Sequence, residues 1–275
     1  MYCKRMGGLM CHVLDVAENW KKLEMFYAAT NVLPPEPQPP QMLKKLLTES
    51  PHYQRNIRTY NSILAFTSMG AQIDKNVMHK GGPFTFRIHG QNHHKLGSLV
   101  PEEGKPPKIL QLYIFDTANE VHNRISAVKR TTKVGELNEK IVKDLITTVD
   151  TFNCLAKVFR KARDRYEAGD CPEFSIKLIG QKKKGKQYDM PTTDEIAGLI
   201  VGDFSKNIGE RDVIVHHKSS GLQQISDLHP LFMTLQYPLL FPYGEIGFHE
   251  GIPVVESEEN TRKRTFITKR EFYAY

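Results

Sequence analysis

The feature that most constrains the fold is a long series of apolar residues at helical spacing in the middle of the chain. Between Asn138 and Tyr166, apolar side chains recur at steps of three and four residues, at Ile141, Leu145, Val149, Phe152, Ala156 and Phe159. This spacing places them on one face of a helix, and such a face must be covered by another element. The sequence therefore predicts one long amphipathic helix lying on a core.

Segments typical of β-strands on both sides of this helix predict an α+β fold. Short runs rich in apolar and β-branched residues occur at 108–116, 173–180, 186–190 and 211–217, with 231–241 as a further candidate. We expect them to form a mainly antiparallel sheet.

Further helices are predicted before and between these strands. A short helical N-terminal piece covers 41–50 and continues from about residue 52 to Gly70, where the glycine would end the helix. Another helix is expected over 117–130, with Asp116 or Thr117 as its N-terminal cap.

A proline-rich stretch divides the chain near its start. Residues 33–40 contain five prolines, which fix φ and lack the amide donor that helices and inner strands need. We therefore expect an extended linker at 33–40 between an N-terminal segment, 1–32, and a main domain that begins at residue 41.

The positive charge of the chain is concentrated in one segment. The whole chain has a formal net charge of +7, and residues 155–186 hold ten Lys or Arg side chains against four acidic ones, a net of +6. A concentrated basic surface attracts polyanions, and nucleic acid is the usual one. The candidate nucleic-acid-binding residues are Lys157, Arg160, Lys161, Arg163, Arg165, Lys182, Lys183, Lys184 and Lys186. Two alternatives stay open: a solvated surface, and cations placed to complement the dipole of a helix C-terminus.

A histidine-rich stretch at 86–99 raises the question of a metal site. His89 and His93 stand four residues apart, a spacing that would align them on a helix. The aromatic and β-branched residues before them, and the Gly-Gln-Asn sequence at 90–92, predict instead a β-hairpin at 84–100 with exposed histidines at its tip. We expect no metal there. We also expect no zinc at Cys3, Cys11 and His12, whose spacing fits no common zinc pattern.

No catalytic motif is complete. Residues 180–186 match G-x-x-x-x-G-K, but Gln187 stands where a nucleotide-binding loop needs Ser or Thr, so we read the stretch as a basic turn. No His-x-His pair accompanies Tyr273 and Tyr275, and no nucleophile elbow occurs. The sequence predicts neither an enzyme nor a cofactor, and it has no stretch apolar enough to cross a membrane.

Six sequence blocks resemble plant Helitron transposon proteins, in the same order. They lie at 55–74, 82–125, 159–166, 196–204, 221–248 and 268–275, and they include "FRKARDRY", "GLQQISDLHPLFMTLQYPLLFPYGEIGF" and "TKREFYAY". Helitron proteins are similar to a rolling-circle DNA-nicking endonuclease fused to an ATP-dependent DNA helicase. The resemblance covers the part that precedes the nuclease, so it implies an α+β domain at 41–252 and a truncated start of the nuclease domain at 253–275.

The resemblance also sets expectations about function. The nicking and helicase motifs of the family lie beyond the last block, so none can be assigned here, and Phe26 and Tyr27 occupy the expected place of a cysteine pair. We therefore expect a non-catalytic, DNA-binding fragment located in the nucleus. The alternatives are a structural platform that packs on the nuclease domain through an apolar face near 231–244, and an inert transposon remnant.

Overall fold

The computed structural model describes most of the chain from residue 37 onward. The described residues are 37–73, 88–129, 137–169, 174–180, 197–201, 212–216, 222–252 and 265–273. The cysteines and histidine of the first twelve residues, the strand predicted at 186–190 and the lysine turn at 182–186 lie outside them.

The described strands form two small antiparallel sheets. The first has the order β1-β2-β6, with β1 at Ser68–Ile73, β2 at Ile88–Leu96 and β6 at Gln223–Ser226. The second has the order β4-β3-β5, with β4 at Ala197–Val201, β3 at Phe174–Leu178 and β5 at Val213–His216. The predicted strands at 173–180 and 211–217 are thus confirmed.

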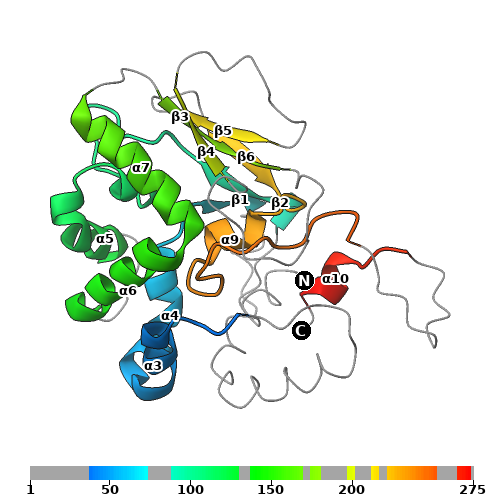
Figure 1. Cartoon of the computed structure of the whole chain (residues 1–275), viewed down its shortest axis with the longest axis horizontal. Helices are drawn as coiled ribbons and strands as arrows, with labels where there is room; N and C mark the ends of the chain where they lie inside the picture. The colour runs from blue at the N-terminus through cyan, green and yellow to red at the C-terminus, as the bar shows by residue number, and fades with distance from the viewer. Residues whose placement is uncertain are drawn as a thin grey trace, which may run out of the picture.

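Helices lie beside the sheets and connect them. The α-helices are α3 (Gln41–Glu49), α4 (Pro51–Ser62), α5 (Glu120–Lys129), α6 (Glu139–Phe152), α7 (Cys154–Ala168), α9 (Phe232–Gln236) and α10 (Lys269–Phe272). Two 3₁₀ turns, η3 (Leu110–Tyr113) and η4 (Thr117–Asn119), precede α5. Figure 1 shows α3 to α7 on one side of the molecule, with α7 beside the second sheet. The α+β class is confirmed, as are the short N-terminal helix at 41–50 and the helix after residue 117.

The single long helix predicted over 138–166 is two helices, α6 and α7, that meet at Asn153. This residue has extended backbone angles, φ −80° and ψ 120°, and its side-chain oxygen accepts hydrogen bonds from the amides of Leu155 and Ala156. Its amide group also donates to the carbonyl of Phe241 at 3.2 Å. The apolar period continues through the break because both helices face the same core, and the hydrogen bond to Phe241 ties the break to a segment far along the chain.

The hairpin predicted at 84–100 is wrong. Residues 88–96 form one continuous strand, in which Gly90 to Asn92 make no turn. β2 pairs antiparallel with β1 through Gly70 and His93, and with β6 through His94 and Ile225. Pairing with β1 on both sides of Gly90 to Asn92, and with β6 from His93 onward, outweighs the turn preference of Gly-Gln-Asn, since β-propensity depends strongly on context. Gly70, expected to end a helix, lies within β1.

Two segments predicted as strands are helical. Residues 110–113 form η3, where Gln111 donates from its buried amide to the carbonyls of Ser98 and Val100 at 3.0 and 2.9 Å. Residues 232–236 form α9 instead of a strand. Short runs that are mostly apolar suit a buried turn of helix as well as a strand, so periodicity does not separate the two.

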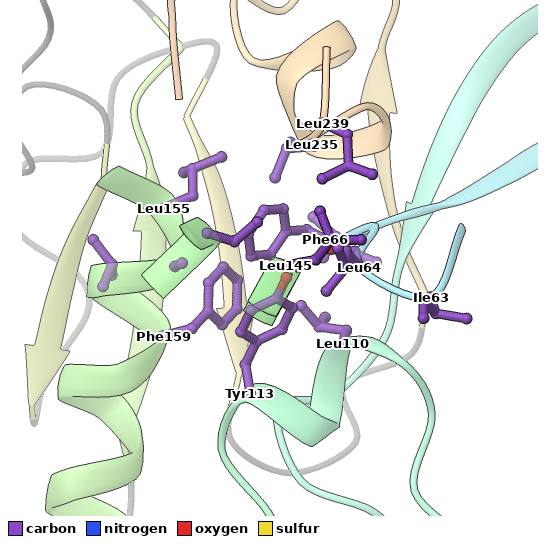
Figure 2. Close-up of a cluster of buried hydrophobic side chains, with 14 of the residues drawn as sticks. Ile63, Leu64, Phe66, Leu110, Tyr113, Leu145, Leu155, Phe159, Leu235 and Leu239 are labelled. Carbon is purple, nitrogen blue, oxygen red and sulfur yellow. Dashed lines mark hydrogen bonds between the residues drawn. The ribbon is translucent and has the colours of Figure 1, made fainter. Parts of the chain in front are cut away.

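One core joins the helices to both sheets. Figure 2 shows the aromatic rings of Phe66, Tyr113 and Phe159 turned toward one another, with Leu145 and Leu235 around them. Phe66 stacks on Tyr113 and on Phe159, with ring centroids 4.7 and 5.3 Å apart. The hydroxyl of Tyr113 donates to the carbonyl of Leu64 at 2.7 Å, so the buried polar atom is satisfied. This core holds α7, the helix that carries most of the predicted site.

Candidate nucleic-acid interface

The outer face of α7 carries three exposed cations in a row. Lys157, Lys161 and Arg165 are exposed and stand four residues apart, so they follow one side of the helix with an axial rise of about 6 Å between neighbours. The opposite face of α7, including Leu155, Val158 and Phe159, is buried, and the helix contacts β3 and β4. We call Lys157, Lys161 and Arg165 the α7 basic row. Within the described part of the chain, no ion pair neutralises it.

Arg160 does not belong to this exposed row, which corrects the prediction. Its side chain is buried, and its guanidinium donates to Asp150, to Glu120 and to the carbonyl of Tyr113 at 3.0, 2.8 and 2.9 Å. Burial acts to lower the pKa of Arg160, but the hydrogen bonds and charges of Asp150 and Glu120 outweigh it and the net shift is upward. Arg160 is a charged structural residue, buried and held by protein acceptors rather than presented to a phosphate.

A second buried arginine completes this network. Arg124 is fully buried, pairs with Glu120 at 2.7 Å and donates to the carbonyl of Ile63. Its guanidinium lies 4.3 Å from the ring centroid of Tyr113, and that of Arg160 lies 5.2 Å away. We call Arg124, Glu120, Arg160 and Asp150 the buried ion network. The members of this network come from three helices, so the sequence gives only one local sign of it, the spacing of four residues between Glu120 and Arg124.

Arg163 is only partly available for a ligand. Its guanidinium contacts Asp164 at 2.7 Å, and its side chain is 29% exposed. The neighbouring Asp164 therefore cancels much of its charge toward a polyanion. Among the five cations predicted on this helix, the three of the α7 basic row are the ones that the structure presents to solvent.

The second half of the predicted site begins at the end of β3. The lysines at 182–186 lie outside the described residues, but Gly180 donates its amide to Asp212 at 2.9 Å, and the other oxygen of Asp212 pairs with Lys177 at 2.7 Å. Asp212 thus fixes the end of β3 and neutralises Lys177. α7 contacts β3, so the helix that carries the α7 basic row packs on the strand that precedes the lysine segment in the sequence.

The histidines of β2 are placed as strand residues rather than at an exposed tip. His94 is buried and stacks on Phe232, with ring centroids 3.7 Å apart and an interplanar angle of 8°. Burial lowers the pKa of His94 to about 3. Among the described residues, no three His, Cys, Asp or Glu side chains gather as metal ligands.

None of the described helices is both long and apolar enough to cross a bilayer. Neither a comparison with models of protein families nor a search of curated proteins finds a match to this chain.

Proposed function

We propose that this chain is a non-catalytic nucleic-acid-binding module that holds a DNA backbone, as the segment before the nuclease would do in a Helitron-type protein. The observation that carries the proposal is the α7 basic row, three exposed cations on one side of a helix whose other side is fixed in the core. Cations on a rigid element neutralise phosphates without reading the bases, which gives binding that depends on salt more than on sequence. The lysines at 182–186 would extend this contact, and nuclear residence is part of the same proposal.

The alternative of a structural platform requires an exposed apolar face, and the structure does not have one at the expected place. The platform hypothesis expects an exposed apolar face near 231–244, but Phe232, Met233, Leu235 and Leu239 are buried. They are covered within this chain by the core that Figure 2 shows in part. The platform therefore has no specific observation in its favour among the described residues.

The test is a fluorescence anisotropy titration of the whole chain against labelled single- and double-stranded DNA at several salt concentrations. We expect binding whose logarithm falls linearly with the logarithm of the salt concentration. The triple variant Lys157→Glu, Lys161→Glu, Arg165→Glu should bind more weakly and lower the slope on duplex DNA by about 2 to 3, since each lost phosphate contact removes about 0.9.

A matched control separates a local contact from the effect of net charge. The triple variant Lys44→Glu, Lys140→Glu, Lys143→Glu makes the same change of charge at exposed positions on α3 and α6. It should retain most of the affinity and the full salt slope. Equal losses in the two triple variants, or no binding by the unaltered chain at low salt, would overturn the proposal.

A further inference from the structure

The end of the proline-rich stretch, residues 37–40, contacts a distant part of the chain. The hydroxyl of Tyr243, 205 residues after Gln38, donates to the carbonyl of Gln38 at 2.6 Å. Pro37 and Gln38 are exposed, whereas Pro40 is buried and leads into α3. The last four residues of the stretch are therefore docked on the body, with one edge open to solvent.

The composition of these four residues favours one backbone conformation. They read Pro-Gln-Pro-Pro, so proline fixes φ at three positions, and a residue that precedes a proline is biased to extended angles. Pro40 has φ −49° and ψ 138°, close to the polyproline II helix. This helix has no internal hydrogen bonds, so its carbonyl groups can accept from a receptor. The bond from Tyr243 uses one of these carbonyls.

The receptor side is a pair of aromatic rings at the junction of α6 and α7. Tyr243 meets Phe152, the last residue of α6, edge to face, with ring centroids 5.8 Å apart and an interplanar angle of 83°. Phe152 is 40% exposed, and Tyr243 is partly exposed. Aromatic surfaces are the usual receptors of polyproline II segments. A tyrosine ring also brings a hydroxyl that can bond the ligand backbone.

The turn that carries Tyr243 is fixed to the same junction. The carbonyl of Tyr243 accepts from the amide of Cys154 at 3.1 Å and from its thiol at 2.9 Å. Gly244, at φ 83°, lies so close that an added Cβ would stand 3.1 Å from the Cys154 nitrogen. The backbone of Tyr243 is thus held by the body and not by the proline-rich segment, as a preorganised binding site requires.

We propose that Tyr243 and Phe152 form a binding site for polyproline II segments, which residues 37–40 of the same chain occupy. A tethered segment meets its site at an effective concentration of about millimolar, so a second proline-rich segment binds well only when the tethered one is loosened. The proline-rich stretch is then a ligand at its end as well as a linker. The inference does not depend on nucleic-acid binding.

The test is a fluorescence anisotropy titration of the whole chain with a labelled peptide that has the sequence of residues 33–40. In an opened variant, Pro37→Gly with Pro39→Gly, the tethered segment loses its stiffness while the buried Pro40 stays in place. The peptide should bind this variant at least about tenfold more tightly than it binds the unaltered chain. A peptide of the same length with its five prolines replaced by alanine should bind neither protein measurably.

Two tyrosine variants, each made in the opened chain, locate the site. Tyr243→Phe keeps the ring and removes the hydroxyl donor, so the affinity for the peptide should fall about three- to tenfold. Tyr166→Phe is the matched control, because it removes the hydroxyl of another exposed tyrosine, and it should leave the affinity unchanged. The proposal is overturned by any of three results: no tighter binding by the opened chain, equal binding of the alanine peptide, or equal effects of the two tyrosine variants.

Discussion

Single buried polar atoms are the residue-scale features with the clearest energetic consequences. Tyr53 and Tyr60 lie on α4 with ring centroids 5.3 Å apart, and both rings are buried. The Tyr60 hydroxyl accepts from the amide of Asn138 at 3.1 Å and pairs with His52 at 3.2 Å. The Tyr53 hydroxyl has no hydrogen-bond partner among the described residues, and burial raises its pKa.

This pair of tyrosines gives a matched prediction. Tyr53→Phe removes an unsatisfied buried hydroxyl, so it should leave the free energy of unfolding unchanged or raise it by up to about 1 kcal/mol. Tyr60→Phe leaves the Asn138 amide without its acceptor and should lower it by about 1 to 2 kcal/mol. Urea denaturation of both variants measures the difference, and equal effects would show that the Tyr53 hydroxyl has a partner in solution.

The buried ion network should be sensitive to the loss of its central anion. Glu120→Gln removes a charge that two buried guanidinium groups share, and breaking such a pair typically costs about 3 to 5 kcal/mol. Glu102→Gln is the control, because Glu102 pairs with Lys105 at the surface and exposed pairs contribute little. Thermal unfolding should show a large decrease for the first variant and almost none for the second. Similar melting temperatures would contradict the role given to Glu120.

At the scale of elements, the break between α6 and α7 sets the direction of the helix that carries the α7 basic row. Each of the two helices begins at an asparagine cap, Asn138 for α6 and Asn153 for α7. The first cap is exposed, whereas the second is buried and also contacts the carbonyl of Phe241. The same residue type therefore has unequal structural roles at the two positions.

Asn153→Ala should destabilise the chain more than Asn138→Ala. Loss of an N-cap costs about 1 kcal/mol, and at Asn153 the freed amides of Leu155 and Ala156 are buried as well, so a total of about 2 to 3 kcal/mol is expected. Asn153→Ser keeps a capping oxygen and should recover part of the loss. Chemical denaturation measures all three, and equal costs for the two alanine variants would contradict the buried cap.

At the scale of the whole molecule, the buried His94 links stability to pH. Its pKa is about 3 in the folded protein and about 6.5 when exposed, so the unfolded chain binds more protons between these values. Its contribution is complete above about pH 6.5 and is lost as pH falls toward 3. The slope is up to about 1.4 kcal/mol per pH unit.

Urea denaturation at pH 7, 6, 5 and 4 checks this dependence. The free energy of unfolding should fall more steeply with decreasing pH in the unaltered chain than in His94→Phe. Other groups titrate in both proteins, so the difference between the two curves isolates His94. Parallel curves would show that His94 is hydrated in the folded state.

The sequence by itself determined the fold class, several secondary-structure elements and the location of the positive charge. Short-range periodicity predicts the α+β class, the helices at 41–50 and after 117, and the strands at 173–180 and 211–217. This periodicity depends only on residues that are close in the sequence, so it does not require knowledge of the tertiary structure. The exposed positions of Lys157, Lys161 and Arg165 also follow, since they lie opposite the apolar series on the same helix. The proline-rich stretch and the cluster of positive charge are likewise read directly from the sequence.

Only the tertiary structure decided where long-range partners override local preference. Asn153 is a buried cap that also bonds the carbonyl of Phe241, and His94 is a core residue in a strand that pairs with β1 on one edge and β6 on the other. Arg160 was predicted on a basic surface, yet it is buried and paired with Glu120, which lies forty residues earlier in the chain. A buried charge or strand edge is stable only when its partner is present, and that partner's position is a property of the folded chain.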